Sequence, residues 1–163
     1  MINARDIARI AFLTMRVSVL LLIGLSSALA QSEDEDAARR LVLSFLVAVG
    51  DGRLDALPGM FVSNANIGTA SLRDGSWVAS TMTFDEWLAG LRERKTWARF
   101  REEVSQFTIH VEDSRMAFVR ADATVFVDDQ ARSHNIDYFT LVREDGTYKF
   151  LSASYVARPV VSD

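Results

Sequence analysis

The chain has 163 residues, of which 49% are hydrophobic and 25% charged, and its formal net charge is −4. This composition is typical of one folded domain and excludes a disordered chain. Because the chain has no cysteine, disulfides, thiolate metal sites and a thiol nucleophile are also excluded.

Residues 1–30 have the three parts of a secretory signal peptide. Three arginines precede an apolar run over residues 17–25, which is shorter than the roughly 20 apolar residues that a transmembrane helix needs. Small residues follow and end in an A-x-A site at Ala30. We therefore predict a cleaved signal and an exported protein, periplasmic or secreted, with Met15 as an alternative start. An uncleaved membrane anchor is the competing interpretation.

Cleavage after Ala30 removes three arginines and one aspartate, which leaves a net charge of −6. Nucleic acids and anionic membranes are bound through clusters of Lys and Arg, and an acidic domain without a basic stripe does not offer them. We therefore expect neither nucleic acid nor a membrane as a partner of the mature protein.

The first part of the mature chain predicts helices. Residues 31–36 form an acidic leader, and apolar side chains then recur at helical spacing from 37 to 49. Gly50 ends this helix, and residues 54–61 predict a second, short helix and a turn. The segments that follow are predicted as strand, turn and strand over residues 64–71, 73–76 and 77–81.

A better-marked helix comes next. Thr83 and Glu86 match a capping box, in which each side chain bonds the backbone of the other residue. Apolar residues at helical spacing then predict a helix from Phe84 to about Arg94.

The remaining chain predicts antiparallel strands over residues 104–111 and 116–127, and a hairpin over 134–157. Within the second strand, small aliphatic residues suit the packed face and leave Arg120 and Asp122 outside: Ala117, Val119, Ala121 and Ala123. Asp145-Gly146 favours a two-residue hairpin turn. The opposed residues that would then share one face are Leu141 with Phe150, Phe139 with Ser152, and Asp137 with Ser154.

Helices followed by a long antiparallel sheet, without regular alternation of strands and helices, predict an α+β fold in which a bent sheet wraps the helices. No repeat or linker interrupts the chain. We therefore expect a single domain over residues 37–158, with a short tail over 159–163.

This order of elements resembles the NTF2-like (SnoaL-like) superfamily. Four segments carry the resemblance: the turn over 52–57, Met60-Phe61 with the polar stretch behind it, the helix start over 83–88, and the closing hairpin over 137–150. The last, DYFTLVREDGTYKF, is most similar to the lumazine-binding branch. The resemblance implies a cone formed by a strongly curved sheet, and a homodimer through the outer sheet face.

The catalytic residues of known members of the superfamily are not matched. Dehydratase-like members use an Asp at the end of the first helix and a His deeper in the pocket. This chain has Gly50 at the first place, and no His occurs before His110. Isomerase-like members place a Tyr on the first helix, where this chain has Phe45. These differences favour a protein that is not an enzyme.

Asp137 is the main candidate for a functional residue. On the predicted face it lies beside Ser154, with Phe139 and Phe150 further inside the cone. Desolvation would raise the pKa of such a carboxyl, which could then act as a base or anchor a ligand. The alternative is an Asp137 at the open rim, solvated or bonded to Ser154.

Trp87 and Trp97 are candidates for an apolar mouth of the cone. Trp87 also fits the packed face of its helix, and Trp97, in the charged stretch 92–103, also fits a partner surface. His110 and His134 have no second ligand at metal-like spacing, so we predict neither a metal nor a cofactor.

The sequence therefore predicts an exported domain that binds a small, partly apolar molecule in its cone without converting it. One alternative is a proton-transfer enzyme (an isomerase, cyclase or dehydratase) with Asp137 as its base. The other is a dimeric interaction module whose cone is filled by side chains.

Overall fold

The computed structural model describes residues 31–93 and 99–160. Its first helix covers residues 31–50. The elements that follow are η1 (Leu54–Ala56), η2 (Pro58–Met60), β1 (Phe61–Arg73), β2 (Ser76–Thr83), α2 (Phe84–Arg92), β3 (Phe100–Glu112), β4 (Met116–Val127), β5 (Gln130–Glu144) and β6 (Thr147–Pro159). No described helix is long and apolar enough to cross a membrane.

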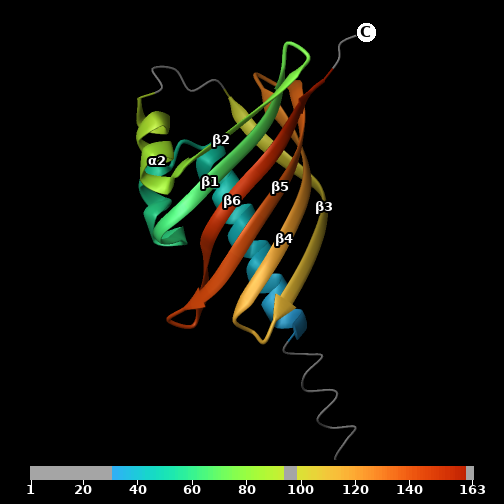
Figure 1. Cartoon of the computed structure of the whole chain (residues 1–163). Helices are drawn as coiled ribbons and strands as arrows, with labels where there is room; N and C mark the ends of the chain where they lie inside the picture. The colour runs from blue at the N-terminus through green and yellow to red at the C-terminus, as the bar shows by residue number, and fades with distance from the viewer. Residues whose placement is uncertain (1–30, 94–98, 161–163) are drawn as a thin grey trace, which may run out of the picture.

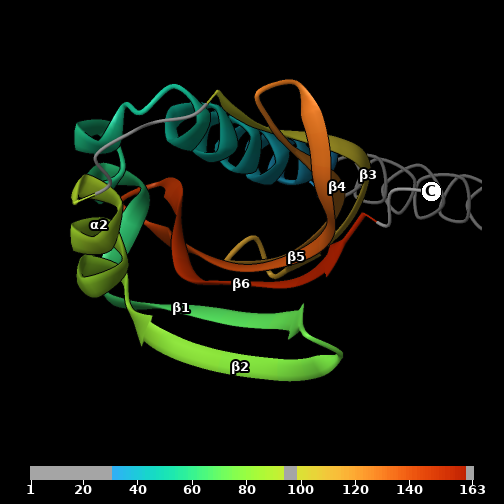
Figure 2. The same ribbon diagram turned by 90° about the horizontal axis from the view of Figure 1, so that it is seen from above.

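The six strands form one sheet in the order β2-β1-β6-β5-β4-β3. The contact between β1 and β6 is parallel, and the other neighbours are antiparallel. The sheet curves strongly without closing, and the first helix lies inside the curve while α2 lies at one end (Figures 1 and 2). The predicted α+β fold with a cone-shaped sheet is confirmed.

Two of the hairpins turn at Asp-Gly pairs. In Asp74-Gly75 and Asp145-Gly146 both residues have positive φ, with 49° and 76° at the first turn and 49° and 80° at the second. Two successive residues in this region match the twist of the flanking strands. The turn predicted at Asp145-Gly146 therefore sets the start of the β5–β6 hairpin.

The first helix is longer than expected, since it includes residues 31–36, which we predicted as a leader. Asp34 in this segment is only 7% exposed and forms an ion pair with Arg143 of β5. On the side that faces the sheet, the helix buries residues at helical spacing: Ala38, Val42, Phe45, Leu46 and Val49. The acidic segment is thus part of the packed helix.

Helix α2 begins with the predicted capping box. The amide of Glu86 donates to Thr83 Oγ1 (3.2 Å), and the amide of Thr83 donates to Glu86 Oε2 (2.8 Å). The helix ends at Arg92, two residues earlier than predicted, and buries Phe84, Leu88 and Leu91. These contacts fix α2 over the end of the cone.

Five phenylalanines join the helices to the sheet: Phe45, Phe61, Phe84, Phe139 and Phe150. The rings of Phe61 and Phe84 stack with centroids 4.1 Å apart, and those of Phe45 and Phe150 lie 5.1 Å apart. The predicted aliphatic row of β4 also points into the core, because Ala117, Val119, Ala121 and Ala123 are all buried. The packed part of the cone lies around this cluster.

Candidate ligand-binding cavity

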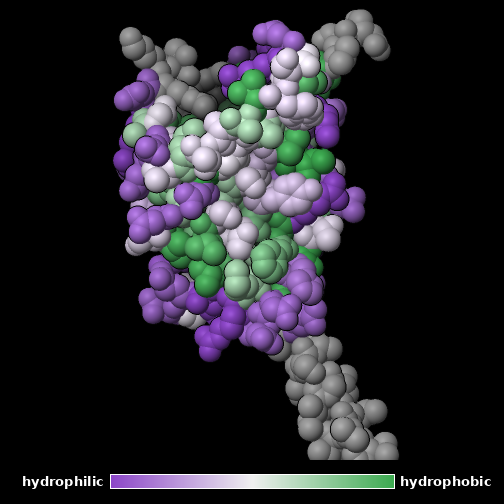
Figure 3. Space-filling model, viewed as in Figure 1, coloured by the Kyte–Doolittle hydropathy of each residue, from purple (hydrophilic) through white to green (hydrophobic). Residues whose placement is uncertain are grey.

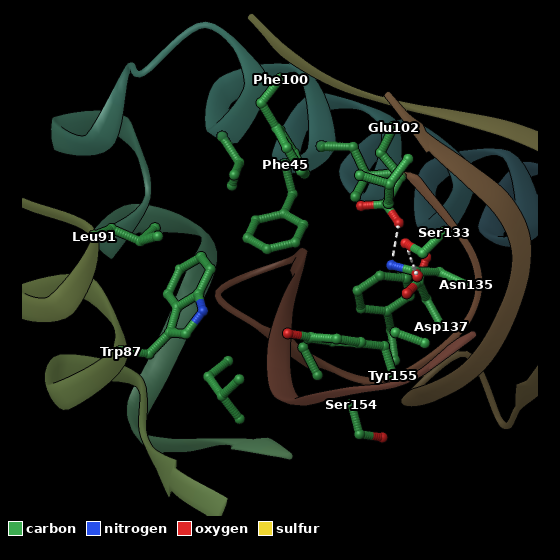
Figure 4. A pocket seen from close by; sticks show the side chains of 17 residues that line it. Phe45, Trp87, Leu91, Phe100, Glu102, Ser133, Asn135, Asp137, Ser154 and Tyr155 are labelled. Carbon is green, nitrogen blue, oxygen red and sulfur yellow. Dashed lines mark hydrogen bonds between the residues drawn. The ribbon is translucent and has the colours of Figure 1, made fainter. Parts of the chain in front are cut away.

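A cavity of about 280 Å³ lies inside the curve of the sheet. The first helix, β1, α2 and strands β3 to β6 all contribute to its wall. Its volume is near the lower end of the range for small-molecule pockets. Figure 4 shows aromatic side chains at one end and polar side chains at the other.

The aromatic end is formed by the first helix and α2. The ring centroid of Phe45 lies 5.9 Å from that of Trp87 and 6.1 Å from that of Phe139. Leu91, one turn after Trp87, and Phe100 at the start of β3 complete this wall. This end of the cavity suits an apolar or aromatic group.

The polar end is a hydrogen-bonded chain that starts on β5. Ser133 Oγ donates to Asn135 Oδ1 (2.9 Å), and Asn135 Nδ2 donates to Glu102 Oε1 (2.8 Å). Ser133, Asn135 and Asp137 share one face of β5 because successive side chains of a strand point to opposite faces. This face places three polar side chains in a row toward the cavity.

Glu102 reaches this row from β3, across the strand that lies between. Ala123 of β4 is paired with Asn135, and Ala121 of β4 is paired with Asp137. Glu102 itself is paired with Val125 of β4, so its side chain reaches Asn135 diagonally, past the small and buried Ala123. The alanine row of β4 therefore provides the space in which the polar residues gather.

Asp137 is only 4% exposed, and its Oδ2 atom receives no hydrogen bond from a donor in the described part of the chain. Burial raises the pKa of its carboxyl to about 8, helped by the negative charge of Glu102, a hydrogen bond with Glu102 and the charge of Asp122. Burial also raises the pKa of Glu102, against which the hydrogen bonds from Asn135 and Asp137 act.

Two carboxyl groups can bond to each other only when one of them holds a proton. Since the pKa of Asp137 is raised to about 8, this proton is present at neutral pH. The two carboxyl groups then share one proton.

The predicted site residues do not all lie in the wall of the cavity. Asp137, Phe139 and Trp87 line the cavity. Phe150 is fully buried in the aromatic core and is not part of the cavity wall. Trp97 lies outside the described residues.

Ser154 borders the cavity, but its side chain points away from the polar residues (Figure 4). The expected pairing of Asp137 with Ser154 is therefore wrong. Leu141 pairs with Phe150 as predicted, but Leu151 is an extra residue on β6, and from there the register moves by one. Asp137 pairs with Tyr155 instead.

The same bulge corrects the rest of the predicted hairpin face. Phe139 pairs with Ala153, not with Ser152, and both residues of the observed pair are buried. A bulge adds one residue to one strand, which exchanges the inner and outer faces beyond it. The inward position that we expected for Ser154 is thus occupied by Ala153 and Tyr155.

Sequence reasoning missed Glu102, Asn135 and Ser133. Glu102 lies in a charged stretch and before the predicted start of its strand. However, Phe100, Glu102 and Val104 alternate with exposed residues. Extending the two-residue period from Val104 back to Phe100 would have placed Glu102 on the inner face.

The position that carries an Asp in dehydratase-like proteins cannot hold one here without movement. A Cβ at Gly50 would lie 2.8 Å from the backbone oxygen of Phe100. Among the described residues, no three or more His, Cys, Asp or Glu side chains are grouped so that they could hold a metal ion. The ionisable side chains in the wall of the cavity are Glu102, Asp137 and Tyr155.

Comparison with solved structures identifies the fold. An NTF2-like protein with a cystatin-like fold from Novosphingobium aromaticivorans superposes with a TM-score of 0.66 at 18% identity, covering 83% of this chain and 89% of that chain. The "beta subunit of a putative aromatic-ring-hydroxylating dioxygenase" from the same organism gives 0.64 at 17% identity, covering 85% and 95%. A "putative scytalone dehydratase", also from this organism, gives 0.57 at 18%, covering 77% and 83%.

Comparison with curated proteins finds no match. The family model described as "Putative lumazine-binding" matches residues 33–156. This range includes the described elements except the first two residues of the first helix and the last three of β6. The chain therefore belongs to the family that carries this description, and it has the fold of NTF2-like proteins.

Proposed function

We propose that this protein is an exported domain that binds a small, partly apolar molecule in its cavity and does not convert it. The observation that carries the proposal is a cavity of about 280 Å³ that has an aromatic end and an acid pair, Glu102 and Asp137, in its wall. Apolar pockets with a few convergent polar groups are typical of small-molecule sites. A ligand with an apolar body and a hydrogen-bond donor would match both ends of the cavity.

The family description supports a small-molecule ligand, and Gly50 in place of an acid supports the absence of dehydratase-like catalysis. Export is supported by the basic, apolar and small-residue segments of residues 1–30. N-terminal sequencing of the secreted protein tests export, with Gln31 as the expected first residue. A product that retains residues 1–30 would contradict the cleavage site.

Ligand binding is tested by a thermal-shift screen of small aromatic and heterocyclic compounds against the purified protein, because a ligand of the native state raises its melting temperature. Ala157 lines the cavity and is half-buried, so Ala157→Phe narrows the cavity without entering the core. Ala131, on the same sheet, is exposed, and Ala131→Phe is the matched control. We expect the shift to disappear in the first variant and to remain in the second.

The raised pKa of Asp137 favours one alternative, a proton-transfer enzyme. Below a pKa of about 8, the pair would donate a proton, and above it, Asp137 would accept one. The test is deuterium exchange into carbonyl compounds, followed by NMR between pH 6 and 9. Exchange that increases through pH 8 and is lost in Asp137→Asn would favour the enzyme over the binding protein.

A homodimer is proposed through the outer face of the sheet. Phe118, Tyr138 and Leu151 lie on three adjacent strands and are 47%, 48% and 41% exposed. Figure 3 shows apolar side chains over this face. Exposed apolar patches often mark contact surfaces. Analytical ultracentrifugation should find a dimer that Phe118→Glu converts to a monomer; a monomeric unmodified protein would contradict this.

A further inference from the structure

The ionisable groups of the cavity are unbalanced in charge. Glu102 and Asp137 line it, whereas none of the described lining residues is Lys, Arg or His. Asp122, the other acid that acts on Asp137, is paired with Arg120 at 2.7 Å. The lining residues of the first helix are the apolar Phe45, Leu46 and Val49. The acid pair thus has no basic partner in the described wall.

The hydrogen bonds of the polar end leave a second need. The donors of Ser133 and Asn135 are neutral and follow the chain that ends at Glu102. Asp137 and Glu102 are joined by one shared proton, without which the two carboxylates would repel each other. A ligand that replaces this proton must therefore bring an N–H donor to the two carboxyl groups.

A positively charged hydrogen-bond donor would balance the charge of the acid pair and donate to its oxygens. Charge-assisted hydrogen bonds to a carboxylate are about twice as strong as neutral ones. Phe45 and Trp87, whose ring centroids are 5.9 Å apart, provide an apolar wall at the other end for the body of the molecule. An anionic ligand would instead add a second negative charge beside Glu102 in a partly dry site.

From this geometry we infer that the cavity takes an organic cation: a protonated amine or amidine on a flat apolar body, with its N–H groups bonded to Asp137 and Glu102. The inference rests on the proposed ligand-binding function and specifies the ligand class. The ammonium takes the place of the proton that the acid pair shares, so that binding at neutral pH releases this proton.

Three probes of one shape test this ligand class: 2-phenylethylamine, 2-phenylethanol and phenylacetate. They share a phenyl ring on a short chain and present a cation, a neutral donor and an anion. Isothermal titration calorimetry with the full chain at pH 7, at probe concentrations up to the millimolar range, measures each affinity. We expect the amine to bind at least tenfold more tightly than the alcohol, about 1.4 kcal/mol, and phenylacetate to bind most weakly.

Two adjacent glutamates provide a matched pair of variants. Glu102 faces the cavity, while Glu103 is on the exposed face of β3 and pairs with Arg101 at 2.7 Å. Glu102→Gln and Glu103→Gln each replace one carboxyl group by an amide of the same shape. We expect the first to reduce the preference for the amine below threefold and the second to leave it unchanged. Asp137→Asn should also remove the preference while the alcohol still binds.

Proton release gives a readout that does not depend on any variant. Titrations of the amine in two buffers with different ionisation enthalpies, both at pH 7, report the protons released. We expect a release that approaches one proton for each amine bound, and none for the alcohol.

The outcomes separate this inference from the function on which it rests. If the alcohol binds as tightly as the amine, or if the amine preference survives in both Glu102→Gln and Asp137→Asn, the cation inference is overturned and the binding function remains. If none of the three probes binds and the broader screen also yields no ligand, the binding function is overturned together with the inference.

Discussion

Asp34, in the first described turn of the N-terminal helix, forms an ion pair with Arg143 of β5, which lies 109 residues further along the chain. The carboxylate side chain is only 9% exposed and the guanidinium side chain 26%. The guanidinium also lies 4.6 Å from the ring centroid of Tyr148 on β6. This pair fastens the beginning of the helix to the β5–β6 hairpin.

Replacing Asp34 should therefore destabilise the fold. In Asp34→Ala the half-buried Arg143 loses its partner, and we expect the free energy of unfolding to fall by about 2 kcal/mol. This is less than the roughly 3–5 kcal/mol expected for a fully buried pair, because the guanidinium is partly hydrated. The control is Asp51→Ala, which breaks an exposed pair with Arg53 and should cost less than about 0.5 kcal/mol. Urea unfolding measures both; equal losses would contradict the role of Asp34.

Gly50 and Gly90 provide the second prediction, because the same substitution should have opposite effects at the two positions. A Cβ at Gly50 would lie 2.8 Å from the backbone oxygen of Phe100. Gly50→Ala therefore requires the backbone to shift, and we expect it to lower the free energy of unfolding by about 1–3 kcal/mol. Nothing lies within 4 Å of a Cβ at Gly90 in α2, so Gly90→Ala should stabilise by about 0.5–1 kcal/mol. The melting temperatures of the two variants should change in opposite directions.

The Asp137 carboxyl provides a prediction on pH. Its pKa is about 8 in the folded protein and about 3.9 when unfolded, so between these values the native state binds the extra proton. The unfolding free energy should consequently fall as pH rises toward 8, by at most about 1.4 kcal/mol per pH unit from this group.

Asp137→Asn removes this contribution. The difference in unfolding free energy between the unmodified protein and the variant should decrease from pH 5 to pH 8 and then level off. Asp145→Asn is the matched control, since Asn-Gly also favours the hairpin turn. Urea unfolding at five pH values measures the effect, and a difference that is independent of pH would show that the acid is not buried as described.

The capping box of α2 provides the last prediction. Thr83→Ala removes the hydroxyl that accepts from the Glu86 amide and should cost about 1 kcal/mol. Thr83→Ser keeps the hydroxyl and should stay within a few tenths of a kcal/mol. Chemical unfolding of both variants tests this, and an equal loss in both would mean that the methyl group matters more than the cap.

Local signals made most of the fold predictable. The Asp145-Gly146 turn, the Thr83–Glu86 box and the alanine row of β4 each reflect interactions between residues close in sequence, and each appears in the structure. Such signals fix an element and the face that it buries.

The site was less predictable, because it depends on contacts between distant strands. The segment after Phe150 is Leu151-Ser152-Ala153-Ser154, whose small residues fit either face of a sheet. The alternation of apolar residues was therefore too weak to reveal the bulge at Leu151. The meeting of Glu102 with Asp137 depends on the sheet order and on small residues between them, neither of which a local pattern contains.

The bulge at Leu151 divides β6 into two parts that contact different regions of the protein. Before it, Tyr148 and Phe150 belong to the hydrophobic core and lie outside the cavity wall; after it, Tyr155 and Ala157 border the cavity, and Ala153 belongs to both core and wall. Substitutions at Tyr155 and Ala157 would therefore change the shape of the cavity with little disturbance of the core. One extra residue thus separates, along a single strand, the positions that stabilise the fold from most of those that shape the cavity.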